Sequence, residues 1–128
     1  MQTSFPNKDT TRNSRGWITW AFQRYDAGMA YEIVVHELAV EELAVIRPFD
    51  QRRLITEIRE QLSDHPGVAT RRRKCLVDLT PTFEHETPVW ELRVGDFRVF
   101  YDVQDDERRV HVRAVRRKKR SQRTEDIV

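Results

Sequence analysis

The stretch WELRVGDFRVFYDV, residues 90–103, consists of two alternating runs on either side of Gly95-Asp96. Alternation with a period of two is typical of half-buried strands, and glycine first in a two-residue connection favours a type II′ hairpin turn. The pairs expected on the apolar face are Val94–Phe97, Leu92–Val99 and Trp90–Tyr101. Arg93 then lies opposite Arg98 on the other face, and like charges in that position favour a nearby carboxylate, such as Glu91, or a bound anion.

The rest of the chain supplies further strands and two helices around this hairpin. Apolar spacing predicts a strand over 31–35, a helix from Glu37 until Pro48, and a second helix that Asp50 caps and His65-Pro66-Gly67 ends. Further strands are expected over 76–79 and 110–115, with a loop over 81–88 and a polar turn over 105–107. The prediction is an α+β fold in which an N-terminal strand and a helical hairpin pack on one face of a small antiparallel sheet.

Length and composition restrict the class of protein. The 128 residues predict one domain, and 38% hydrophobic residues with a mean hydropathy of -0.73 are typical of a small, polar globular fold. The single cysteine excludes an internal disulfide, and the four scattered histidines show no metal-ligand spacing, so we expect no metal and no cofactor. Without a long apolar run or a signal peptide, we expect a cytoplasmic protein with no membrane partner.

Residues 1–28 differ from the rest. They are polar at first and then carry aromatic residues, whose spacing from Trp17 to Tyr25 suggests a short helix. Because Met29 directly precedes the first predicted strand, we expect residues 1–28 to form an N-terminal extension, either mobile or packed as an arm. Residues 29–128 are then the folded domain.

The small net charge of +2 hides an uneven distribution. Residues 29–66 carry a net charge of -4, whereas residues 67–123 carry +6. Arginine dominates the basic runs, and its planar guanidinium matches phosphate oxygens and can stack on bases. Such runs indicate either a polyanionic partner or a solvated basic face. The runs contain Arg71, Arg72, Arg73, Lys74, Arg113, Arg116, Arg117, Lys118, Lys119, Arg120 and Arg123.

These features together resemble the RelE/ParE toxin superfamily. The string Leu92 to Tyr101 is similar to the superfamily's L-R-x-G-D-[YF]-R-[VI]-x-Y pattern, and the likeness extends from about Met29 to Arg123. Members are toxins of bacterial toxin–antitoxin pairs, and two activities dominate among them: cleavage of mRNA, often on the ribosome, and inhibition of DNA gyrase. The resemblance implies a cognate antitoxin and favours a metal-independent endoribonuclease that inhibits translation, with gyrase inhibition as the alternative.

The resemblance also suggests site residues. Arg98 matches the arginine that contacts the scissile phosphate in RNA-cleaving relatives, the predicted hairpin places Arg93 beside it, and Lys118 falls near a second basic position of those relatives. The structural alternative is that Arg98 pairs with Glu91 or with a C-terminal acid. Phe100 projects with Arg98 and either stacks on a base or packs on the C-terminal segment. Further RNA contacts are expected from Arg71, Arg72, Arg73, Lys74, Arg113, Arg116, Arg117, Lys119 and Arg120.

Cleavage also needs proton transfer by a base and an acid, because arginine supplies only positive charge. The tyrosine that many cleaving relatives carry past the basic run is absent here, and Thr124 lies nearest that position. The candidates that remain are Glu91, whose basicity two arginines would reduce, and His111, which titrates near neutrality. The missing tyrosine leaves gyrase inhibition, or a family member that binds only its antitoxin, as rival functions.

Overall fold

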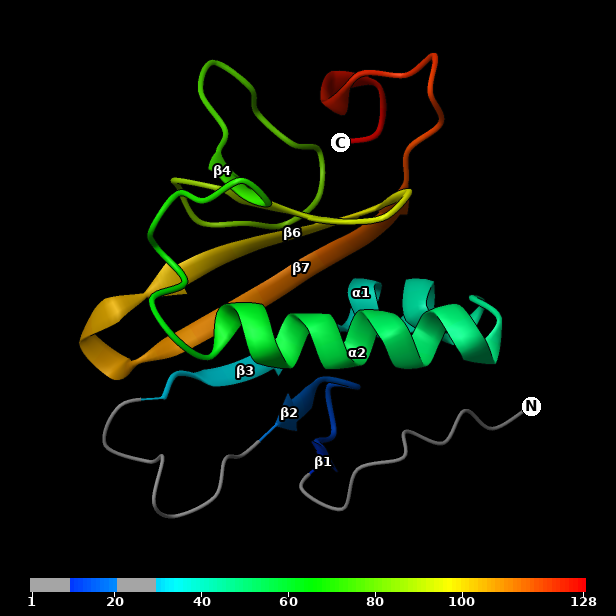
Figure 1. The fold of residues 1–128 in the computed structure, drawn as a ribbon. Coiled ribbons are helices and arrows are strands. Elements are labelled where there is room, and N and C mark those ends of the chain that lie inside the picture. The colour runs from blue at the N-terminus through cyan, green and yellow to red at the C-terminus, as the bar shows by residue number, and fades with distance from the viewer. Residues whose placement is uncertain (1–9, 21–29) are drawn as a thin grey trace.

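A computed structural model describes residues 10–20 and 30–128 (Figure 1). Its centre is a seven-stranded sheet in the order β1-β2-β3-β7-β6-β5-β4, antiparallel throughout except for the parallel pair β3–β7. The strands are β1 Thr10–Arg12, β2 Ile18–Trp20, β3 Glu32–Val35, β4 Arg73–Cys75, β5 Trp90–Val94, β6 Phe97–Gln104 and β7 Arg109–Arg117. The helices are α1 Glu37–Ala44 and α2 Pro48–Leu62, with short 3-10 turns η2 Asp105–Glu107 and η3 Thr124–Asp126. The predicted α+β class, with a helical hairpin on one face of the sheet, is confirmed.

The central hairpin β5–β6 has the register that the sequence predicted. All three apolar pairs are present, and Arg93 lies opposite Arg98. Gly95 has a φ of +57°, which the first position of a type II′ turn requires and which glycine adopts at little cost. The turn therefore fixes which side chains of β5 and β6 face the helices and which face away from them.

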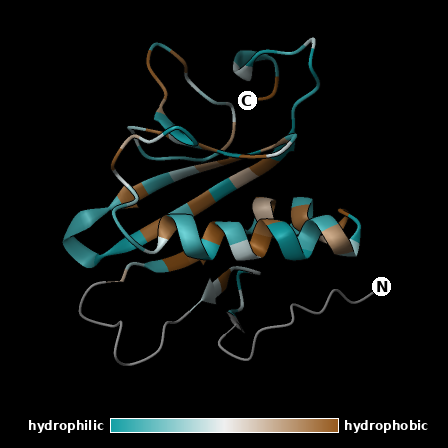
Figure 2. Cartoon of the chain, in the orientation of Figure 1, coloured by the Kyte–Doolittle hydropathy of each residue, from teal (hydrophilic) through white to brown (hydrophobic). Residues whose placement is uncertain are grey.

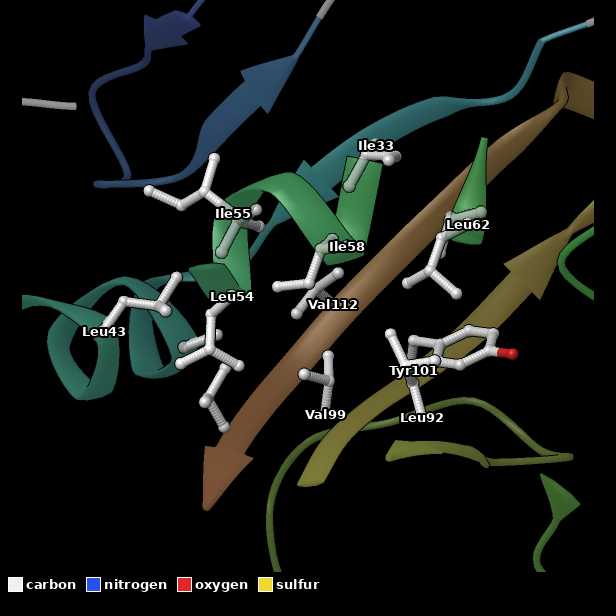
Figure 3. Packing of buried hydrophobic residues seen from close by; sticks show 14 of the residues in the cluster. Ile33, Leu43, Leu54, Ile55, Ile58, Leu62, Leu92, Val99, Tyr101 and Val112 are labelled. Carbon is white, nitrogen blue, oxygen red and sulfur yellow. The ribbon is translucent and has the colours of Figure 1, made fainter. Parts of the chain in front are cut away.

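The main core lies between the helices and the sheet. Leu54, Ile58 and Leu62 of α2 are fully buried and face Val99 and Val112 of the central strands (Figure 3). Burying such side chains stabilises a fold by about 1.5–3 kcal/mol each. Figure 2 shows the corresponding pattern, with bands of hydrophobic colour alternating with hydrophilic ones along β6 and β7 and hydrophilic colour at the turn that joins them.

The start of α2 differs from the prediction. The helix begins at Pro48, and Asp50 lies inside the first turn, where its carboxylate accepts a hydrogen bond of 2.7 Å from Arg47 Nε. Proline is suited to the first helical position because its fixed φ is helical. A backbone N–H at this position would have no partner within the helix, so its absence costs nothing. Pro48 therefore separates the helices by starting the second one, and Asp50 is not its cap.

The fourth strand also lies elsewhere than predicted. The sequence predicted a strand over 76–79, but β4 comprises Arg73–Cys75 at the edge of the sheet. An edge strand tolerates charged residues because one side of it faces solvent. Val77 is 75% exposed, whereas Leu76 packs against a second apolar cluster on the face away from the helices.

Strand β7 contains an irregularity that reverses its alternation. Phe100 pairs with Ala114, but Tyr101 pairs with Val112, so Arg113 is an extra residue in the ladder. Strict alternation over the predicted strand 110–115 would place Ala114 on the same face as Val112, and the extra residue makes that expectation wrong. Ala114 belongs to the second cluster, and Val115 joins the main core instead.

The described part of the predicted extension forms two strands of the sheet. Ile18 and Trp20 in β2 are buried in the main core, so the helix expected from Trp17 onward is wrong for this part of the chain. The rest of that expected helix lies in residues 21–29, outside the described residues, and the boundary at residue 29 stays a prediction. No helix of the described residues is long and apolar enough to cross a membrane.

A basic cleft as candidate functional site

The side of the sheet away from the helices carries a second, smaller layer. The loop after β4 and the C-terminal segment lie on this side (Figure 1). Phe83 from the loop and Ile127 from the C-terminal segment pack against Phe100 and Ala114. Phe100 is fully buried, with its ring centroid 5.7 Å from that of Phe83, so it is not available to stack on a base. The packing alternative is the observed arrangement.

A cleft of about 710 Å³ opens on this side between the end of β4, the hairpin β5–β6 and the C-terminal segment. Arg93, Arg98 and Lys118, the three residues suggested as catalytic, all line it. Lys118 is held there because its backbone N–H donates to the carbonyl oxygen of Asp96 at 2.7 Å. The other charged lining residues are Lys74, Asp78, Glu91, Arg123 and Glu125. Five cations against three carboxylates make the cleft an anion-attracting surface.

The guanidinium of Arg98 forms hydrogen bonds within its own hairpin. Its Nη1 donates to the carbonyl oxygens of Gly95 at 2.8 Å and Phe97 at 2.9 Å, which holds the guanidinium near the turn. Burial lowers the pKa of Arg98, Glu91 counteracts that shift, and neighbouring Arg93 adds to it. Arginine remains charged in proteins even so. Arg93 is exposed, so these two residues place two positive charges on adjacent strands of one wall.

Glu91 is the buried carboxylate of the cleft, with 4% exposure. Its Oε1 accepts a hydrogen bond of 2.8 Å from Thr124 Oγ1, and its Oε2 lies 3.4 Å from Lys74 Nζ. A buried carboxylate needs such partners because losing its hydration is costly. Glu91 therefore joins β5 to the C-terminal segment and to β4. Its oxygens are engaged by Thr124 and Lys74 and not by Arg98, so the pair with Arg98 that stood as the structural alternative is not the observed arrangement.

Several other predicted contacts in the first basic run are engaged in the fold. Arg73 is buried, and its Nη1 donates to the carbonyl oxygens of Gln61 and Asp64 near the end of α2, where carbonyls lack helical partners. Arg72 forms a 2.7 Å ion pair with Glu57. Arg73 is therefore unavailable to RNA, and of this run only Lys74 lines the cleft.

Some residues of the second basic run form contacts within the fold, and others are exposed. Arg113 is 7% exposed and forms a bidentate pair with Asp102, at 2.7 and 3.2 Å, so the predicted RNA contact is not available. Arg116 lies against Glu42 of α1 and donates to the carbonyl oxygen of Ile127. Arg117 stacks on Phe97 on the side of the helices. Lys119 and Arg120 are exposed beyond β7.

His111, the second acid–base candidate, lies outside the cleft. Its Nδ1 is 2.8 Å from His36 Nε2, and its Nε2 is 3.0 Å from Gln104 Oε1. Burial lowers the pKa of His111, and neighbouring Arg113 lowers it further. Its surroundings are Asp102 and Arg113, so the structure does not bring it together with Arg93 and Arg98.

Sequence reasoning missed the residues that close the cleft. Thr124 and Gln122 from the C-terminal segment and Leu76 to Leu79 from the loop form its walls. The sequence indicated Thr124 only as the residue nearest the position where many cleaving relatives carry a tyrosine. No local pattern predicted its bond to Glu91, because the two residues are 33 positions apart.

The fold and the basic cleft define a protein of the RelE/ParE toxin superfamily. A family model described as "ParE toxin of type II toxin-antitoxin system, parDE" matches residues 33–122. The chain therefore belongs to the ParE toxin family of type II toxin–antitoxin systems. The chain is similar to a solved structure of the archaeal RelE–RelB complex from Pyrococcus horikoshii OT3, with a TM-score of 0.56 and 22% identity over 73% of this chain and 100% of that one. Comparison with curated proteins gave no match.

Proposed function

We propose that the chain is a toxin that acts by binding its target, DNA gyrase, through the basic cleft and its rim, and does not cleave RNA. Membership of the ParE toxin family supports this target. The observation that carries the proposal is the state of Glu91, whose two oxygens are engaged by Thr124 and Lys74 at 4% exposure. A carboxylate held in this way is poorly placed to accept a proton from a substrate hydroxyl.

The other acidic and imidazole groups support the same conclusion. No histidine lines the cleft within the described residues, and the rim carboxylates Asp78 and Glu125 are exposed. An efficient general base has a pKa near the working pH, which enzymes obtain by burial and neighbouring charges. Binding needs no such group, and an array of arginines suits an acidic surface of a protein target.

A metal-independent endoribonuclease is the second candidate. One observation favours it: Arg93, Arg98 and Lys118 meet in a single cleft, as stabilisation of the charge on a scissile phosphate would require. Under this alternative mRNA, free or on the ribosome, is the partner. The rim carboxylates or a group on the ribosome would then transfer the proton.

The two candidates can be separated with purified protein and with cells. Plasmid supercoiling by gyrase is measured against toxin concentration for the wild type, Arg98→Ala, Lys118→Ala and the exposed control Arg71→Ala, while mRNA 5′ ends are mapped after induction. We expect the wild type and Arg71→Ala to inhibit supercoiling equally. The two cleft variants should inhibit it about tenfold less well, the effect of losing one good interface contact, with transcripts intact.

Other results would change the assignment. New 5′ ends that disappear in both cleft variants, with supercoiling unaffected, would replace the proposal with the endoribonuclease. No growth defect and no effect in either assay would leave a family member that binds only its antitoxin.

A further inference from the structure

The basic cleft also has an apolar part, which lies on a single segment of the chain. All three aliphatic residues that line the cleft, Leu76, Val77 and Leu79, belong to the loop after β4. Val77 is 75% exposed, and Leu79 is partly buried. The cations come from the strands and from the C-terminal segment, which rises from the same side of the sheet as this loop (Figure 1). The cleft therefore combines an apolar wall with positive charge around it.

The backbone on either side of Val77 fixes how this residue is presented. Before it, Leu76 packs in the second apolar cluster, and its N–H donates to the carbonyl oxygen of Val89 at 2.8 Å. After it, Asp78 has a φ of +56°, in the left-handed region that aspartate enters more readily than most residues other than glycine. Because Leu76 is anchored in the fold and the chain turns directly after Val77, the side chain of Val77 stays exposed at the cleft.

The composition of the cleft distinguishes between two kinds of anionic ligand. Single-stranded nucleic acids are held by bases that stack on aromatic or guanidinium planes, in addition to contacts with phosphates. No aromatic side chain lines the cleft within the part of the chain that the structure describes, since Phe83 and Phe100 are buried in the second cluster. An aliphatic wall offers no flat surface for a base. Beside arginines, it instead matches a peptide segment that carries carboxylates and an apolar side chain.

We propose that the basic cleft binds an acidic segment of the protein surface of gyrase, with an apolar side chain of that segment packed on Val77. Carboxylates of the segment would face Arg93, Arg98 and Lys118. The inference rests on the proposed function and narrows it, because it makes protein, and not the DNA on which gyrase acts, the ligand of the cleft. Val77 is then a specificity-determining residue, since the cations attract any polyanion and the apolar wall selects among them.

The test measures binding between purified gyrase and toxin labelled at its N-terminus, without DNA and at several salt concentrations. We expect Val77→Ser to raise the dissociation constant about tenfold, because an apolar contact at the interface is lost. Its salt dependence should equal that of the wild type, because no charge changes, whereas Arg98→Ala should reduce the salt dependence. The matched control Val68→Ser changes a valine that is 51% exposed and lies outside the cleft, and it should leave the dissociation constant within about twofold of the wild type. Equal midpoints in urea will show that both serine variants fold.

A second titration replaces gyrase with a single-stranded DNA oligonucleotide. We expect its affinity to be about tenfold or more below that of gyrase and to be the same for the wild type and Val77→Ser, as for a purely electrostatic contact. Equal affinities of these two toxins for gyrase would overturn the inference, and so would binding of gyrase that appears only after DNA is added. Inhibition of supercoiling by the wild type would still support the proposed function in both cases. If the wild type neither binds gyrase nor inhibits it, the proposed function fails and the inference fails with it.

Discussion

At the scale of single residues, the hydrogen bond between Thr124 and Glu91 holds the C-terminal segment over the sheet. Thr124→Val keeps the shape of the side chain but removes the donor 2.8 Å from Glu91 Oε1. A buried acceptor left without its partner costs about 1–3 kcal/mol, so we expect the free energy of unfolding to fall by that amount in urea denaturation. The control Ser121→Ala alters an exposed hydroxyl nearby and should change it by less than about 0.5 kcal/mol. Equal effects of the two variants would contradict the role assigned to this bond.

Whether the position of a site residue could be predicted from the sequence depends on whether its contacts are local or distant along the chain. The facing of Arg93 and Arg98 could be predicted because a two-residue turn fixes the register of a hairpin. The burial of Arg73 and Arg113 could not, because it depends on partners distant in sequence, such as Gln61 and Asp102. In the sequence these arginines are indistinguishable from exposed neighbours such as Arg71.

At the scale of elements, prediction succeeded wherever the signal lay within one element or one turn. The apolar stripe of α2 and both strands of the central hairpin are examples. It failed for β2, for β4 and for the extra residue Arg113 in β7. Each of these is decided by a neighbouring strand, and a three-residue strand carries too few residues to establish a period.

Strand β2 offers a test of how closely the N-terminal residues belong to the fold. Trp20 is fully buried in the main core, on the strand that pairs with β3. The substitution Trp20→Ala removes the largest fully buried side chain of this core. We expect a loss of about 3–5 kcal/mol in the free energy of unfolding, measured by denaturant titration. Val77→Ala, at an exposed position, serves as the control. A loss below about 1 kcal/mol for Trp20→Ala would mean that β2 is not an integral part of the core.

At the scale of the whole molecule, a chain of hydrogen bonds connects segments that are far apart in sequence. Arg113 Nη1 lies 3.4 Å from His36 Nδ1, and the second nitrogen of His36 lies 2.8 Å from His111. Because arginine only donates, His36 Nδ1 is an acceptor, so its Nε2 carries the proton and donates to His111. Trp17, from the turn between β1 and β2, packs on His36 with ring centroids 4.1 Å apart. This series of hydrogen bonds requires the imidazoles of both His36 and His111 to be neutral.

This requirement makes the stability of the fold depend on pH. Burial and the nearby Arg113 lower the pKa of His36 from 6.5 to about 3, so between these values the unfolded chain binds a proton that the folded chain does not. The stabilising contribution is therefore complete above about pH 6.5 and is lost as the pH falls toward 3. Allowing for solvent screening, we expect the free energy of unfolding to drop by about 2 kcal/mol between about pH 6.5 and pH 4.5.

The variant His36→Gln isolates this effect, because glutamine can accept from Arg113 and donate to His111 but does not titrate. Urea denaturation at a series of pH values should give a flatter dependence for His36→Gln than for the wild type, because the wild type alone loses the His36 contribution as the pH falls below about 6.5. The control His65→Gln changes an exposed histidine and should reproduce the wild-type slope. Parallel curves for the wild type and His36→Gln would contradict the linkage. Any acid sensitivity of the fold would then come from its carboxylates instead.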